Sequence, residues 1–236
     1  MRYIYYAYQY LIAWPLFALF TFLTALTTIV WAAAPNSRFI HGVQALWSRS
    51  FFYLMFIPVR LTGSEHLQEG QSYVFVSNHQ SFSDVFLVYG WLPVVFKFLM
   101  KQELRKIPFV GLACQICGHI FVDRRNLRQA GASLKMVEQR LQNGVCTVIY
   151  PEGTRSLTGE VQPFKRGAFQ VALHLGLPVV PLSVTGCYEC MPKGAKVINR
   201  HPVHLHIGKP MDLSMYSDEN VAIEAVRKVV IEGMQA

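Results

Sequence analysis

The sequence predicts an α/β fold in which a mostly parallel sheet is flanked by helices and preceded by an N-terminal membrane-associated helical segment. After Gly63, strand-like and helical stretches alternate, which is typical of a parallel sheet covered by helices. Before that point the chain is apolar, and no charged residue occurs from Tyr3 to Ser37. The 236 residues suit one such domain with an appendage. We therefore predict a helical segment over residues 1–62 and an α/β domain over residues 63–236.

The composition favours an anionic, lipid-like partner. The chain is 52% hydrophobic, and its formal net charge is +8. A basic chain attracts nucleic acid or anionic lipid, and the long apolar N-terminus favours a phospholipid bilayer. Basic residues interleaved with aromatic ones, as in single-stranded nucleic-acid grooves, are not evident, so we predict no nucleic-acid partner. The five dispersed cysteines indicate a reducing compartment.

Residues 11–34 form the strongest membrane signal. They carry no charge, and at ~1.5 Å rise per residue they can cross a hydrocarbon core of ~30 Å. Aromatic residues crowd both ends of this stretch, as in interfacial belts. A cleaved signal peptide is the alternative, supported by Ala32-Ala33-Ala34, but the apolar run is too long and only Arg2 precedes it. Whether this helix spans the bilayer or dips into one leaflet stays open.

A second apolar segment covers Val43 to Leu61. Arg49 and Arg60 leave too short an uncharged stretch for a confident span. An interfacial helix, or the return arm of a helical hairpin, fits this pattern. A core helix of the α/β domain is the alternative.

Apolar runs and hydrophobic periodicity predict the strands and helices of the α/β domain. Predicted strands are Ser72–Ser77, Val94–Met100, His119–Asp123, Val145–Tyr150, Val179–Val184 and Val203–Ile207. Predicted helices are Asn126–Gln142, Lys165–Leu175 and Asp218–Met234, the first stopped by Gly144.

A histidine and an acid follow the first of these strands. The strand ends at Asn78-His79, and Asp84 comes five residues after the histidine, in the first turn of the next helix. In open α/β sheets ligands bind at the carboxyl edge of the strands. A carboxylate that orients an imidazole makes a base able to take a proton from a hydroxyl. Ordinary turn and capping chemistry is the alternative.

Cationic residues follow other predicted strands. Because parallel strands end at one rim, Lys101, Arg124 and Arg155 can converge on one cleft beside His79. Arginine suits bidentate contact with phosphate oxygens, and lysine supplies a point charge. Gly153 would let the backbone approach a ligand closely. The alternative is structural: a Glu152–Arg155 salt bridge and solvated surface charges.

Two Cys-x-x-Cys pairs have the spacing of metal ligands. They are Cys114/Cys117 and Cys187/Cys190. Two such pairs can build a tetrahedral zinc site. The first pair lies in an apolar run, however, and free cysteine is a common core residue.

Four motifs in order carry a family resemblance. They are Asn78-His79-x4-Asp84, Gly118-x2-Phe121-x2-Arg124, Pro151-Glu-Gly-Thr-Arg-Ser156 and Val180-Pro181. Together they resemble the 1-acylglycerol-3-phosphate (lysophosphatidic acid) acyltransferase family over about residues 60–210, in its short bacterial form. Two departures are Tyr150, where phenylalanine is usual, and His119, where an apolar residue is usual. Neither falls on a motif position that carries chemistry.

The resemblance implies a glycerolipid acyltransferase fold and a function in phospholipid biosynthesis. The enzyme would move a fatty acyl group from acyl-CoA or acyl carrier protein to the sn-2 hydroxyl of lysophosphatidic acid, giving phosphatidic acid. His79 would be the general base and Asp84 its orienting acid. Further implied roles are phosphate binding for Lys101, Arg124 and Arg155, and shaping of the acceptor site for Asn78, Phe121, Glu152, Gly153 and Thr154.

No cofactor and no metal are implied, because the thioester is already activated. The implied place is the cell (inner) membrane, with the catalytic domain on the cytoplasmic face. Backbone N–H groups near the Asn78 turn or Gly153 are candidates for the oxyanion stabiliser.

The main alternative function is the same chemistry on another lysophospholipid. Two more distant alternatives are a non-catalytic lipid-binding protein and a hydrolase. The sequence lacks the Gly-x-Ser-x-Gly nucleophile elbow that is typical of many hydrolases.

Overall fold

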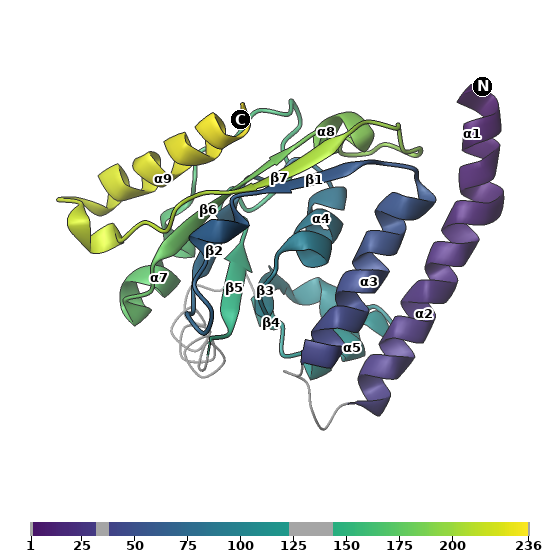
Figure 1. Ribbon diagram of the computed structural model, residues 1–236, viewed down its shortest axis with the longest axis horizontal. Helices are drawn as coiled ribbons and strands as arrows, with labels where there is room; N and C mark the ends of the chain where they lie inside the picture. The colour runs from purple at the N-terminus through teal and green to yellow at the C-terminus, as the bar shows by residue number, and fades with distance from the viewer. Residues whose placement is uncertain (1, 32–37, 123–143, 236) are drawn as a thin grey trace.

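The computed structural model describes residues 2–31, 38–122 and 144–235, which form a sheet covered by helices on both faces (Figure 1). Among the described residues the sheet has seven strands in the order β1-β7-β6-β2-β5-β3-β4. The strands are β1 (Val59–Thr62), β2 (Val74–Ser77), β3 (Phe96–Lys101), β4 (Ile120–Val122), β5 (Cys146–Ile149), β6 (Val179–Thr185) and β7 (Val203–Ile207). All neighbours are parallel except the β6–β7 pair, which is antiparallel. The predicted mostly parallel sheet is therefore confirmed.

The alternation of side chains along the strands divides the core into two layers. Tyr73 and Phe75 belong to the larger apolar cluster, whereas Val74 and Val76 belong to the second one. This is the period of two expected of a strand that is buried on both faces. Helices α3 (Arg38–Leu54) and α4 (Ser83–Trp91) cover one face, and α7 (Gln170–Leu175) and α9 (Glu219–Gly233) cover the other (Figure 1). Two further short helices are α5 (Val110–Ile116) and α8 (Cys187–Cys190).

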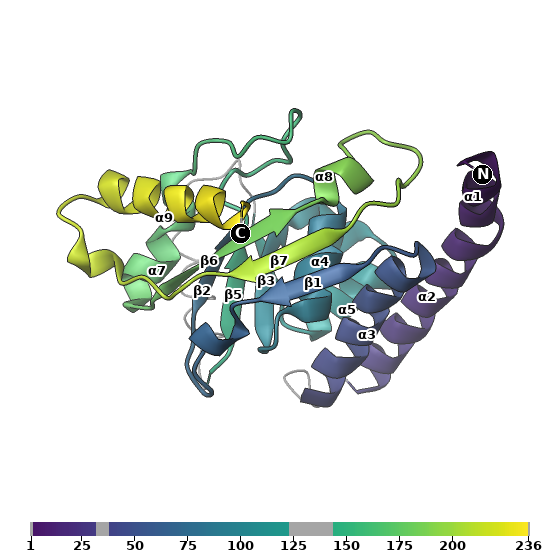
Figure 2. The same cartoon turned by 45° about the horizontal axis from the view of Figure 1, so that its top comes forward.

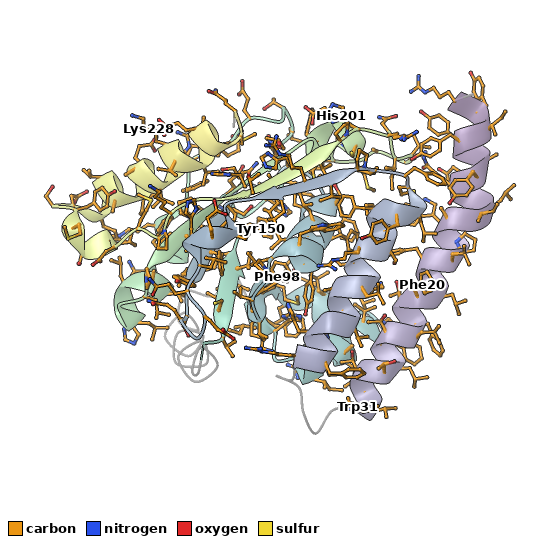
Figure 3. The ribbon with its side chains drawn as sticks, in the orientation of Figure 1. Phe20, Trp31, Phe98, Tyr150, His201 and Lys228 are labelled. Carbon is orange, nitrogen blue, oxygen red and sulfur yellow. The ribbon has the colours of Figure 1, made fainter. Side chains whose placement is uncertain are left out.

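The N-terminal segment is one long helix with a π-helical turn in it. It consists of α1 (Arg2–Tyr8), the π-turn Gln9–Ala13 and α2 (Trp14–Val30), and α3 returns beside it as the second arm of a hairpin (Figure 2). By length and composition Arg2–Val30 could cross a membrane. Phe20 points away from the rest of the protein and is 41% exposed (Figure 3).

The observed elements differ from the predicted ones in two places, and a third prediction is not tested. The end of the predicted Val43–Leu61 segment is not helical, because α3 ends at Leu54 and Val59–Thr62 pairs with β7 as an edge strand. The predicted helix Lys165–Leu175 begins with a 3₁₀ turn at Arg166–Ala168 before α7. The predicted helix Asn126–Gln142 lies outside the described residues.

Candidate active site

His79 and Asp84 lie in the turn between β2 and α4, at the carboxyl edge of the sheet. The imidazole Nδ1 is 2.9 Å from Asp84 Oδ2. The same oxygen accepts the backbone N–H groups of Gln80 (2.6 Å) and Ser81 (2.8 Å). The tautomer that donates from Nδ1 to this acceptor oxygen leaves Nε2 with its lone pair. The Asp84 side chain is fully buried, whereas that of His79 is 17% exposed and so reachable.

The loop that follows β5 holds the backbone of His79. Glu152 Oε1 accepts the His79 N–H (2.6 Å), and Glu152 Oε2 accepts the Gln162 N–H (3.0 Å). The Ser156 N–H donates to the His79 carbonyl (2.8 Å). Burial raises the pKa of Glu152, which the two backbone N–H groups partly offset. Within the described residues Glu152 serves this backbone and forms no salt bridge with Arg155, which was the structural alternative.

Tyr150 forms a flat support for the imidazole. Its ring stacks on His79 with centroids 4.2 Å apart and planes inclined by 24°. Phe98 in turn stacks on Tyr150, with ring centroids 6.2 Å apart, and both rings lie in the centre of the molecule (Figure 3). The Tyr150 hydroxyl is buried and has no hydrogen-bond partner within the described residues. Burial, with the neighbouring Asp84, raises the pKa of Tyr150 well above its ordinary value.

The predicted cations differ in their placement. Lys101 ends β3, and its Nζ lies 3.0 Å from Glu103 on the exposed surface. Arg155 is half-buried in the loop that holds His79. Arg124 lies outside the described residues.

A further cation, Lys165, comes close to the motif loop. Gly153 has φ +75°, and a Cβ built there would lie 2.9 Å from Lys165 Nζ. The missing side chain of Gly153 therefore leaves the space in which this ammonium group lies. No role was predicted for Lys165 from the sequence, because it lies outside the four motifs.

The remaining predicted residues have varied positions. Asn78 is fully buried, and its amide pairs with the backbone of Val184, donating at 2.9 Å and accepting at 2.8 Å. It thus ties the end of β2 to β6. Phe121 lies in edge strand β4, half-buried, and Thr154 is exposed in the motif loop.

The backbone groups considered as oxyanion donors are already engaged. The N–H of His79 donates to Glu152, and those of Gln80 and Ser81 donate to Asp84. The Gly153 N–H donates to the Tyr150 carbonyl at 3.1 Å. In this arrangement none of these four groups is free to stabilise an oxyanion.

An apolar pocket of about 350 Å³ runs between the hairpin and the sheet. Residues from α2, α3, α4, β3 and α5 line it, among them Ala25, Trp47, Phe86, Phe98 and Val110. Phe98 connects it to the base, because this ring also stacks on Tyr150 beneath His79. The pocket is therefore linked to His79 through the rings of Phe98 and Tyr150, although neither Tyr150 nor His79 lines it.

The cysteines are free thiols. Cys114 and Cys117 belong to α5 and its end, whereas Cys187 and Cys190 belong to α8. Burial raises the pKa of Cys114 and of Cys190 to about 12. In the described part of the chain no three His, Cys, Asp or Glu side chains come together as a metal site.

Three comparisons agree on the family. The family model described as Acyltransferase matches residues 58–185. A chloroplast 1-acyl-sn-glycerol-3-phosphate acyltransferase of Arabidopsis thaliana is 33% identical over 84% of this chain and 54% of its own length. The human 1-acyl-sn-glycerol-3-phosphate acyltransferase alpha is 40% identical over 55% of this chain and 46% of its own. The chain thus spans about half the length of these curated relatives.

A solved structure matches the whole chain. The crystal structure of the 1-acyl-sn-glycerophosphate (LPA) acyltransferase PlsC from Thermotoga maritima superimposes with a TM-score of 0.80. The match covers 100% of this chain and 98% of that one, at 28% identity. It includes the N-terminal hairpin as well as the sheet.

Proposed function

This chain belongs to the acyltransferase family, and on that premise we propose that it acylates the sn-2 hydroxyl of lysophosphatidic acid to give phosphatidic acid. The observation that carries the proposal is the His79–Asp84 pair. Its Nδ1–Oδ2 distance is 2.9 Å, and its carboxylate is held by two backbone N–H groups. Such a base can deprotonate a hydroxyl, and in an acyltransferase the oxygen then attacks an activated acyl group.

The proposed reaction uses the imidazole nitrogen that does not contact Asp84. His79 Nε2 takes the proton of the acceptor hydroxyl as its oxygen attacks the thioester carbonyl. The Asp84 carboxylate stabilises the imidazolium that forms. The tetrahedral intermediate collapses, the C–S bond breaks, and the imidazolium returns its proton to the leaving thiolate. No covalent acyl-enzyme, cofactor or metal enters these steps.

Cations around the motif loop would bind the acceptor phosphate. Arg155 lies in the loop that holds His79, and Lys165 Nζ lies over Gly153 in the same loop. Lys101 and Arg124 are proposed to contribute as well, Lys101 by leaving its exposed pairing with Glu103. Such surface pairs contribute little stability, so a phosphate can replace the carboxylate at low cost.

The apolar pocket would hold the acyl chain of the donor. It is lined by apolar side chains of α2, α4 and α5, and Phe98 in its wall stacks on Tyr150, the ring that contacts His79. Burying each methylene contributes about 0.8 kcal/mol, so such a pocket can select for chain length. The thioester is that of acyl-CoA or acyl carrier protein.

The N-terminal hairpin would bring this site to its lipid substrates. Its outer side exposes large apolar residues, including Leu19, Phe20 and Leu23. An exposed apolar surface of this kind supports membrane association, as does the length of the apolar helix Arg2–Val30. We place the enzyme at the cell (inner) membrane with the catalytic domain on the cytoplasmic face, where acyl thioesters are available.

A substrate panel tests the proposal. The protein in vesicles is given labelled acyl-CoA or acyl carrier protein and, in turn, lysophosphatidic acid and lysophospholipids that carry a headgroup. The proposal expects the highest kcat/KM with lysophosphatidic acid. A preference for a headgroup-bearing acceptor would establish the alternative activity instead, and no transfer to any acceptor would leave a lipid-binding protein.

A further inference from the structure

A buried glutamine joins the N-terminal helix to the segment that follows α8. Gln9 opens the π-helical turn and is fully buried. Its Nε2 donates to the Ile198 carbonyl (2.6 Å), and its Oε1 accepts the Ile198 N–H (3.0 Å). One side-chain amide therefore pairs with both polar groups of one buried residue, as a neighbouring strand would.

The same turn faces outward with apolar side chains. Tyr10, Leu11 and Ile12 are 53%, 76% and 48% exposed. π-Helical turns are rare and often occur at functional sites. Here the turn presents a polar group inward and an apolar surface outward, and the segment after α8 reaches toward it (Figure 2).

The segment that Gln9 holds also contacts the turn that carries the catalytic pair. The Asn199 N–H donates to the Cys190 carbonyl (2.8 Å), which closes the segment on the end of α8. Next to Cys190, the Met191 carbonyl accepts the hydroxyl of Ser81 (2.7 Å). Ser81 is itself fully buried.

Ser81 in turn sets the position of the acid. Its N–H donates to Asp84 Oδ2, and its hydroxyl oxygen accepts the Ser83 N–H (3.1 Å) at the start of α4. A continuous set of hydrogen bonds and chain links therefore runs from Gln9 through Ile198, Met191 and Ser81 to Asp84, and it is buried at both ends.

We propose that Gln9 is a positioning residue, which orients the Asp84–His79 pair through the segment from Cys190 to Asn199. The enzyme then has its base fully aligned only when the N-terminal helix is seated on the catalytic domain. This inference rests on the proposed acyl transfer, since one of its readouts is the rate of that reaction.

The test replaces Gln9 with a residue of similar shape that cannot pair. Gln9→Met keeps the length of the side chain but leaves the Ile198 N–H and C=O without partners. Tyr10→Phe is the matched control, because it removes a hydrogen bond to Lys196 of the same segment from an exposed residue of the same turn. Folding is checked by thermal unfolding, and membrane association by vesicle flotation.

We expect kcat per folded, vesicle-bound enzyme to fall at least about tenfold in Gln9→Met, since displacements of ~1 Å can cost far more. KM should stay within about twofold, because no binding residue is touched. The backbone N–H groups of residues 78–84 should exchange with deuterium faster than in the wild type. Tyr10→Phe should match the wild type in both readouts. In a double-mutant cycle the effects of Gln9→Met and Ser81→Ala should be less than additive, because both act on one set of contacts.

Unchanged exchange at residues 78–84 in Gln9→Met overturns the inference whatever the activity. So does a loss of activity that only follows the amount of folded, bound protein. If Gln9→Met does not fold, Gln9→Glu replaces it, because that side chain still accepts the Ile198 N–H. Loss of the fold in both variants makes Gln9 a purely structural residue. If the wild type shows no acyl transfer but Gln9→Met still exchanges faster at residues 78–84, only the proposed function is refuted.

Discussion

The imidazole of His79 lies on the ring of Tyr150, 4.2 Å away between centroids and inclined by 24°. The contact limits rotation of the proposed base and would place a π-face against the imidazolium that forms when His79 takes a proton. Aromatic pairs of this kind contribute about 0.5–1.5 kcal/mol beyond their burial. The phenol itself adds no hydrogen bond within the described residues.

Two substitutions of Tyr150 should distinguish the effect of the aromatic ring from the effect of its hydroxyl. Tyr150→Leu should lower kcat by up to about tenfold, the equivalent of that contact energy. Tyr150→Phe keeps the stack and should retain kcat within about threefold. Because it removes a buried, unpaired hydroxyl, its free energy of unfolding should equal or exceed that of the wild type by about 1 kcal/mol. Steady-state kinetics and urea unfolding check both; a Tyr150→Phe variant as impaired as Tyr150→Leu would contradict the account.

Glu152 should make stability depend on pH in a defined direction. Burial raises its pKa above the ordinary value of 4.5 in the folded protein, so the folded state holds this proton more tightly than the unfolded chain. The stability that this group contributes is complete below pH 4.5 and is lost as the pH rises through the folded pKa. In chemical unfolding, the unfolding free energy of the wild type minus that of Glu152→Gln should fall as the pH rises across that window. A difference that grows with pH would refute the assignment.

Lys165 should affect acceptor binding more than the chemical step. Its Nζ lies over Gly153 in the loop that holds His79. Lys165→Ala should raise KM for lysophosphatidic acid about tenfold, since a charge-assisted hydrogen bond contributes roughly 1.5–3 kcal/mol. Lys228→Ala removes the same charge from α9 (Figure 3) and should leave KM unchanged. Equal effects of the two variants on KM would mean that only the net charge matters.

The pocket should limit the length of the acyl chain. Ala25 is buried in its wall, so Ala25→Phe fills part of the volume. Blocking two or three methylenes at about 0.8 kcal/mol each predicts at least a tenfold loss with palmitoyl-CoA relative to octanoyl-CoA. Leu26→Phe is the control, because Leu26 is 47% exposed. If Ala25→Phe lowers the rate with both donors alike, the chain binds elsewhere.

The His79–Asp84 pair could be predicted from sequence because its two residues are close together in the chain. A buried strand that runs into His79, with an acid five residues later, determines a local arrangement, and the structure brings the two side chains together. The predicted family and mostly parallel sheet are confirmed. Edge strand β1 was missed because four residues after an apolar helix carry little strand signal.

The contacts that depend on distant segments could not be predicted in this way. The Tyr150 stack requires β2 and β5 to be neighbours, and the sequence does not state the strand order. Lys165 reaches Gly153 only because the chain folds back after the motif loop. Gln9 meets a residue 189 positions later, so its polarity within an apolar stretch was the single available signal.

The most direct test of the central claim is the rate of acyl transfer to lysophosphatidic acid by His79→Ala. A general base contributes at least about 100-fold, so kcat should fall by that factor or more while the variant stays folded and bound to vesicles. A His79→Ala enzyme that retains kcat within a few-fold of the wild type would contradict the claim that this imidazole takes the proton.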